Sequence, residues 1–146
     1  MRNMGLAAAM LLAATSFATP AAAQRSAARY GNYTDVSAIH VLPGQWENYL
    51  DFVKTSWVKQ QEWAKHKGYI VGYSVVAATY PREGEPNLLL ITEYKDIPSQ
   101  AEAERRQNEY VSMMKMDEHQ MDSAAVTRAP MRTLGSQEQY QEILLK

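Results

Sequence analysis

The chain has 146 residues, 15 basic and 16 acidic side chains with a formal net charge of −1, and no cysteine. This length fits one domain, on the prior of roughly 100–200 residues per domain. The near-neutral charge, with no basic stripe and no stacking motif, argues against nucleic acid or an anionic membrane as a partner. The lack of cysteine excludes disulfides, thiolate catalysis and cysteine metal sites.

The first two dozen residues have the three-part pattern of a secretory signal peptide. Arg2 supplies a basic start, Leu6–Ala18 is apolar and uncharged, and Pro20–Ala23 offers small residues for cleavage before Gln24. The apolar run is shorter than the roughly 20 residues that a spanning helix needs. We therefore predict a signal peptide over residues 1–23 and a periplasmic or secreted protein with no membrane association after cleavage. A cysteine-free exported chain favours the periplasm.

Residues 24–33 have no hydrophobic period and are predicted to be a flexible N-terminus, followed by a single domain over residues 34–146. The first predicted strand is Thr34–Leu42, in which Ile39 and Val41 alternate with Ala38 and His40. Both faces carry apolar groups, so both are expected to be covered.

The segment Gln45–Lys67 predicts the clearest helix. One stripe at helical spacing comprises Trp46, Tyr49, Leu50, Val53, Trp57 and Ala64. Gly68 follows where a left-handed residue ends many helices. Phe52 and Trp63 lie on a second flank, which another subunit or the C-terminal part of the chain could cover.

The second half of the chain predicts a hairpin, a helix and a last strand. Tyr69–Tyr80 and Asn87–Tyr94 are two strands joined by a turn that is rich in Pro and Gly. Ser99 and Glu102 have capping-box spacing at the start of a helix that reaches Met114 and extends as far as Ala125 if unbroken. Residues 128–135 are irregular, and Glu138–Leu145 can form the last strand.

The predicted order is β-α-β-β-α-β, which is an α+β, ferredoxin-like arrangement with one antiparallel sheet and helices on one face. The other face is expected to hold His40, Tyr73 and Leu89, side chains that are poorly suited to water. A second copy of the sheet is the simplest cover, so we predict a homodimer.

The chain resembles the dimeric α/β-barrel superfamily, which includes antibiotic-biosynthesis monooxygenases, NIPSNAP-type domains and small ether-degradation accessory proteins. The resemblance rests on Ile39–Gly44, Trp46–Trp57 and Leu89–Tyr94, and it covers residues 34–146. It implies that two sheets pack into a barrel and that a pocket lies between sheet and helices. Some members of the superfamily bind haem, but no residue of this sequence demands it.

His40 and Glu93 are the candidate catalytic residues. A neutral imidazole inside an apolar strand can act as a base near physiological pH, and a desolvated Glu93 could relay the proton. The alternatives are a hydrogen-bonded structural His40 and a Glu93 that points to solvent or pairs with a lysine. Trp57, Tyr73 and Tyr94 could line a flat pocket for an aromatic ligand, although core packing explains Trp57 equally well.

The methionines between Met113 and Met121, with His119, suggest a copper site, because thioethers and imidazole suit Cu(I). On one helix, however, His119 lies about 140° from Met114, so the ligands do not converge. Methionine as a core filler is the better interpretation. We predict neither a metal site nor a cofactor.

Three functions remain open from the sequence. The leading hypothesis is an exported dimeric domain that binds a small apolar or aromatic molecule between sheet and helices. The second is a cofactor-free oxygenase or isomerase that uses His40. The third is an interaction domain that binds a partner through Phe52 and Trp63. An enzyme should place His40 and a second polar group in one enclosed pocket, whereas a binding module should have the cavity without that pair.

Overall fold

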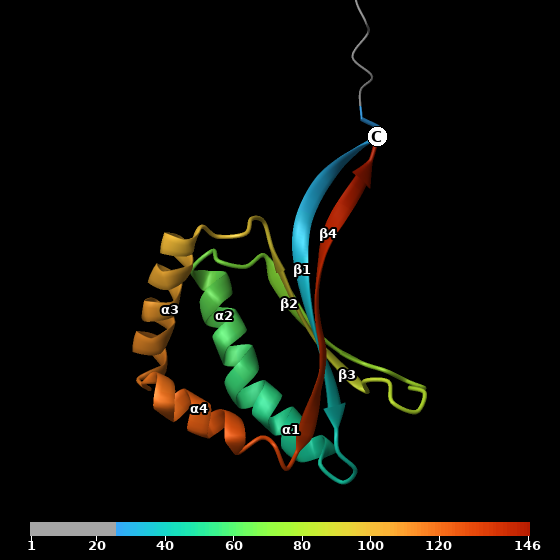
Figure 1. Cartoon of the computed structure of the whole chain (residues 1–146), viewed down its shortest axis with the longest axis vertical. Helices are drawn as coiled ribbons and strands as arrows, with labels where there is room; N and C mark the ends of the chain where they lie inside the picture. Colours follow the sequence, from blue (N-terminus) through green and yellow to red (C-terminus); the bar gives the residue numbers. More distant parts are fainter. Residues whose placement is uncertain (1–25) are drawn as a thin grey trace, which may run out of the picture.

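The computed structural model describes residues 26–146, so the predicted signal peptide lies outside the described residues. The fold is α+β, and a four-stranded antiparallel sheet has the order β2-β3-β1-β4, compatible with a ferredoxin-like fold (Figure 1). The elements are β1 (Ala28–Val41), α1 (Trp46–Phe52), η1 (Val53–Trp57), α2 (Val58–His66), β2 (Gly72–Ala77), β3 (Leu88–Tyr94), α3 (Gln100–Met114), α4 (Glu118–Val126) and β4 (Arg132–Leu145). Within residues 26–146, no helix combines the length and apolar character needed to cross a bilayer.

The first and last strands, β1 and β4, are longer than the sequence predicted. β1 begins at Ala28 rather than Thr34, and β4 begins at Arg132 rather than Glu138. Ala28 pairs with Leu145, and the backbone N–H of Lys146 donates to the carbonyl of Ala27 at 2.9 Å. Residues 28–33 pair with residues 141–145, and residues 132–137 pair with residues 37–41, so each added segment is a strand because the other strand supplies its backbone partners. The pair extends beyond the rest of the sheet as an arm (Figure 1).

The helix predicted over residues 45–67 is present as the continuous run α1, η1 and α2. Its apolar stripe packs on the sheet, where Tyr49 and Val53 join Ile39, Leu88 and Leu90 in the buried core. Gly68 has φ +73°, as expected of a residue that ends a helix in the left-handed region. A π-helical segment over Val53–Trp57 interrupts the α-helix, and the sequence pattern did not predict it.

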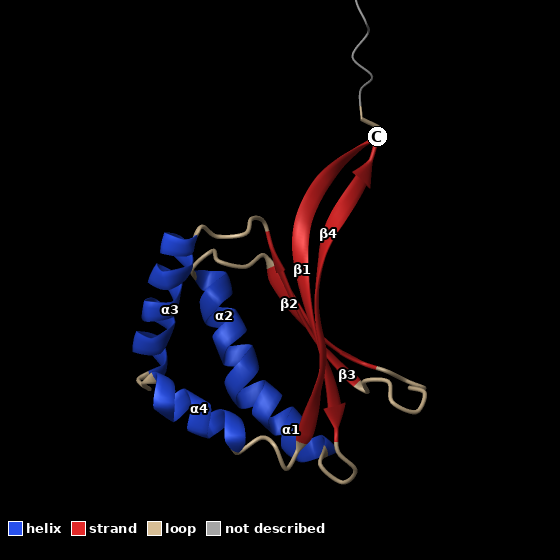
Figure 2. Ribbon diagram, viewed as in Figure 1, coloured by secondary structure: helices blue, strands red, loops and turns tan. Residues whose placement is uncertain are grey.

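The helices of the described residues all lie on one side of the sheet (Figure 2). The opposite side, called here the open face, carries His40 and Leu89 as predicted, because their neighbours Ile39, Leu88 and Leu90 are in the helix-side core. The prediction for Tyr73 was wrong. Tyr73 pairs with Thr92, and its ring meets Trp57 of η1 at 5.5 Å between centroids, so it faces the helices.

The second helical region breaks in two. Ser99 caps α3 by accepting a hydrogen bond from the Glu102 N–H at 3.4 Å, while the Glu102 carboxylate binds Arg105 and Arg106 rather than closing a capping box. α3 ends where Lys115 adopts φ 54°, and Asp117 then begins α4 with a full capping box. α3 packs on α2 rather than on the sheet, through the rings of Trp63 and Tyr110.

Lys115 provides a test of this break. It is a non-glycine residue in the left-handed region, which favours glycine. We expect Lys115→Gly to raise the free energy of unfolding by about 0.5–1 kcal/mol. Lys59→Gly, an exposed site inside the first helical run, should lower it by about 1 kcal/mol. Urea unfolding measures both, and a loss of stability in Lys115→Gly would show that the left-handed turn is not formed in solution.

Candidate functional site

A cleft lies between the helix side of the sheet and the helices. It consists of two cavities, of about 690 Å³ and about 510 Å³, and both are lined by Ser37 and Gln137. We call them the polar cavity and the apolar cavity. The cleft exists because α3 packs on α2 and because the β1–β4 half of the sheet presents polar side chains there, among them Ser37, Gln137 and Gln139. Such side chains gain little from burial under a helix.

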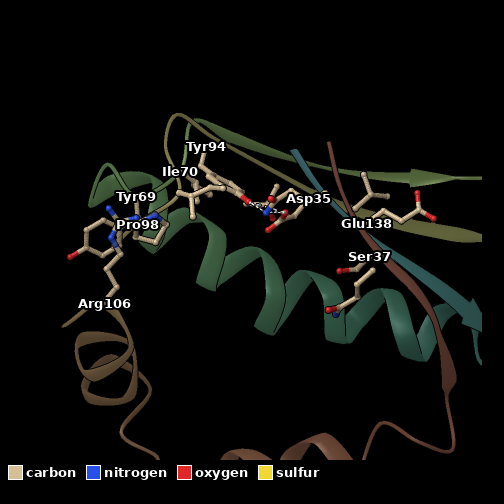
Figure 3. Close-up of a pocket in the computed structure, with 13 residues that line it drawn as sticks. Asp35, Ser37, Tyr69, Ile70, Tyr94, Pro98, Arg106 and Glu138 are labelled. Atoms are coloured by element: carbon tan, nitrogen blue, oxygen red, sulfur yellow. Dashed lines mark hydrogen bonds between the residues drawn. The ribbon is translucent and has the colours of Figure 1, made fainter. Parts of the chain in front are cut away.

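The polar cavity contains a hydrogen-bonded group of three side chains (Figure 3). The Tyr94 hydroxyl donates to the Asp35 carboxylate at 2.9 Å, and the Gln139 amide donates to the same carboxylate at 3.1 Å. The Tyr94 ring stacks on Tyr33 with centroids 5.9 Å apart. Strand register brings the three together, because Asp35 of β1 pairs directly with Gln139 of β4.

The far side of the polar cavity comes from the start of α3 and the loop before β2. Tyr69, Pro98 and Arg106 lie together there in Figure 3. The Arg106 guanidinium lies 4.5 Å from the Tyr69 ring centroid and donates to Glu102 at 2.6 Å. Its charge is therefore already paired within α3. This end of the cleft can therefore form hydrogen bonds with a ligand, but the charge of Arg106 is not available to it.

Tyr94 acts as a hydrogen-bond donor at neutral pH. Burial, and then the hydrogen bond to Asp35, raise the pKa of Tyr94 to about 12. Because the folded-state pKa is raised above 10.0, the stability that this adds is complete below pH 10 and is lost as pH rises towards 12. At neutral pH Tyr94 therefore keeps its proton and can donate a hydrogen bond, but it cannot serve as a base.

The raised pKa predicts a late phenolate in an alkaline titration. We expect Tyr94→Phe to remove one phenolate absorbance step near pH 12 and to leave the steps near pH 10 unchanged. Ultraviolet difference spectra of the variant and the unaltered protein measure this directly. If the missing step lies near pH 10 instead, the hydrogen bond to Asp35 is not formed in solution.

The apolar cavity is bordered by residues of the helical segments α1, η1, α2, α3 and α4 and of the strands β1, β3 and β4. Aromatic and methionine side chains are prominent in its wall, including Phe52, Trp57, Tyr110, Met114, Met116 and Met121. The predicted role of the methionines as fillers is thus only partly right, because these three border an open volume. Met side chains are flexible and polarizable, so such a wall adapts to apolar ligands of different shape.

Two arginines border the apolar cavity as well. Arg128 follows α4 and lies with its guanidinium carbon 4.8 Å from the Phe52 ring centroid. Arg132 begins β4 and lies 5.8 Å from the ring centroid of Tyr49. Both positive charges lie against aromatic faces, and the quadrupole of an aromatic ring attracts cations to its face.

The structure does not bring the two candidate catalytic residues together. Glu93 pairs with Thr34, so His40 lies six residues further along β1, roughly 20 Å away at the rise of a strand. Both lie on the open face, and neither lines the cleft. Glu93 accepts a hydrogen bond from the Asn32 amide at 2.7 Å, and His40 lies against the backbone of Gly135. The proposed proton relay cannot form within one chain.

The three predicted ligand-binding residues all lie on the helix side of the sheet, but in different places. Tyr94 lines the polar cavity and Trp57 the apolar cavity. Tyr73 lines neither, because its ring packs on Trp57 and its hydroxyl donates to Glu62. Phe52 and Trp63 are half-buried beneath the chain's own C-terminal half, where they meet Arg128 and Tyr110. They do not form the exposed patch that an interaction domain would need.

Sequence reasoning missed Asp35, Gln139, Arg128 and Arg132. A usable signal was present in β4, where Gln137, Gln139 and Gln141 alternate and place three amides on one face. Arg128 and Arg132 stand four residues apart in a segment that was interpreted as irregular. Their convergence on the cavity depends on the bend between α4 and β4, which no periodicity marks.

Comparison with known proteins identifies no relative. No family model matches the sequence, and neither a curated protein nor a solved structure matches the chain. The resemblance to the dimeric α/β-barrel superfamily therefore stays a prediction.

Proposed function

We propose that this domain binds a small apolar or aromatic molecule in the apolar cavity. The observation that carries the proposal is the volume of about 510 Å³ bordered by aromatic and methionine side chains on the helix side of the sheet. Ligand sites are typically concave and mostly apolar, with a few polar groups that orient the ligand. The adjoining polar cavity supplies such groups in Asp35, Tyr94 and Gln139. A cavity without a paired His40 is the arrangement expected of a binding module rather than an enzyme.

A substitution that fills the cavity tests this proposal. Ala124 and Ala125 are neighbours on α4, but only Ala124 lines the cavity, whereas Ala125 is exposed. We expect Ala124→Phe to abolish binding of 2-naphthamide, a neutral aromatic probe, in isothermal titration calorimetry. Ala125→Phe should bind the probe as the unaltered protein does.

Native mass spectrometry of the protein isolated from the cells that produce it is the complementary measurement. A retained small molecule that is absent from Ala124→Phe would support the proposal. If the unaltered protein binds no probe and retains no molecule, or if both alanine variants bind equally, the proposed site is wrong.

We also propose that a second copy of the chain covers the open face. Val36 pairs with Ile91 and Leu89 pairs with both Ala38 and Val76, so apolar side chains run across three adjacent strands. Val76 is 42 % exposed, and Tyr140 of β4 is 54 % exposed. A broad apolar face of this kind marks an association surface in soluble proteins.

The arm supports self-association. Tyr30 pairs with Ile143, and Leu145 lies two residues further along the same face of β4; these side chains are 73 %, 59 % and 82 % exposed. A two-stranded ribbon is marginally stable alone in water, so packing against a second copy would stabilise it. In a two-fold symmetric dimer, the arm of each subunit would pack on the other subunit, so that both the open face and the arm are covered. With the signal peptide proposed for residues 1–23, the functional form is an exported homodimer.

A further inference from the structure

Among the side chains that the structure describes, the two arginines at the apolar cavity have no acidic partner. Ion pairs among the described side chains involve Lys67, Arg82, Arg105 and Arg106, and none of them includes Arg128 or Arg132. Arg128 donates to the carbonyl of Ala124 at 2.9 Å. The Nε of Arg132 is buried without a hydrogen-bond partner. The described residues that line the cavity include no Asp or Glu.

This arrangement is electrostatically unfavourable without an anion. Burial, and then the nearby charge of Arg132, lower the pKa of Arg128, as expected of a half-buried cation beside a second cation. A buried, unsatisfied donor is costly because it gives up its hydrogen bond to water without replacement. One anionic group placed between the two guanidinium groups would pair both charges.

The chemistry of the cavity narrows the kind of anion. A guanidinium matches a carboxylate with two parallel hydrogen bonds, and the pairing is stronger where water is excluded. The remaining wall has an apolar part, with Phe52, Trp57, Met114 and Met121 among its side chains, and the hydroxyls and amides of Ser37, Ser56, Gln60, Thr127 and Gln137. A ligand with one carboxylate and an apolar body satisfies both parts of the cavity.

We propose that the ligand of this domain is an apolar monocarboxylate, whose carboxylate binds Arg128 and Arg132 while its body lies against the methionines and aromatic rings. This inference rests on the proposed binding function and adds the charge of the ligand to it. The two arginines select for the anion, and the methionine wall tolerates different apolar bodies.

A pair of probes that differ only in charge tests the inference. We would titrate the intact domain with 2-naphthoate and with 2-naphthamide in the calorimeter. A hydrogen-bonded charge pair predicts that 2-naphthoate binds about 10- to 150-fold more tightly. The variant Arg128→Met/Arg132→Met keeps the apolar stems, so it should bind 2-naphthamide normally and lose the preference for 2-naphthoate. Arg82→Met, whose side chain is 87 % exposed in the β2–β3 loop, is the matched control and should retain the preference.

Each outcome has a distinct meaning. Equal affinity for the two probes in the unaltered protein, or a preference that survives in the double variant, would overturn the carboxylate proposal and leave the binding function intact. Binding of neither probe, with no retained molecule in native mass spectrometry, would overturn the binding function itself. If the double variant fails to fold, the single variants Arg128→Met and Arg132→Met, each with a reduced preference, decide the question.

Discussion

Tyr49→Ala should lower the free energy of unfolding by about 3–5 kcal/mol, as truncation of a large buried side chain does. Tyr49 is 1 % exposed and is among the largest fully buried side chains of the described residues. It contacts both layers of the fold, since it belongs to α1 and packs in one cluster with Ile39 and Val41 of β1 and with Leu88 of β3. A domain of this size has about 5–15 kcal/mol of stability, so the loss should be a large part of the total.

Tyr80→Ala is the matched control for this prediction. It removes the same atoms from a side chain that is 92 % exposed, so the expected change is within about 0.5 kcal/mol. Urea unfolding followed by circular dichroism measures both variants. A small effect at Tyr49, comparable with that at Tyr80, would contradict the packing of α1 on the sheet. If Tyr49→Ala does not accumulate in cells, Tyr49→Phe, which keeps the ring, is the variant to compare with Tyr80→Ala.

Ile91→Lys should convert the proposed dimer to a monomer. Ile91 lies at the centre of the open face, paired with Val36 of β1 and Ser74 of β2. A two-fold axis would bring two copies of the new charge into one apolar interface, where each is poorly solvated. We expect the dissociation constant to rise at least about 100-fold, which corresponds to roughly 3 kcal/mol. Sedimentation equilibrium across a range of concentrations measures it.

Ile97→Lys makes the same chemical change away from the open face. Ile97 is 56 % exposed in the loop before α3 and lines the polar cavity instead. This variant should sediment as the unaltered protein does. The dimer proposal fails if the unaltered domain is a monomer at high concentration, or if Ile91→Lys is folded and still sediments as a dimer.

Local patterns were sufficient to predict most of the regular structure. The helix stripe from Trp46 to Trp57 packs on the sheet, Gly68 ends the helix in the left-handed region, and Ser99 caps α3. These features depend on side chains within one or two turns of each other, so periodicity and capping chemistry reveal them. The long β1–β4 arm was missed, because its strands depend on pairing between residues more than a hundred positions apart.

The candidate site could not be predicted in the same way. The hypothesis of a His40–Glu93 pair assumed that two residues on one sheet face were close, but strand register places Glu93 opposite Thr34. Register likewise brings Asp35 next to Gln139, and Tyr94 then reaches both. Distances of this kind follow from how strands align, and several registers are compatible with the same alternation of side chains.

Composition, periodicity and capping residues were enough to establish an α+β chain whose apolar stripes and strand faces call for two packed layers. The position of the cleft, the convergence of Arg128 and Arg132 on it and the separation of His40 from Glu93 arose only when the strands aligned and α3 turned onto α2. Interactions between near neighbours follow directly from the order of residues, so the sequence reveals them. A binding site is assembled from side chains that long-range strand pairing and packing bring together.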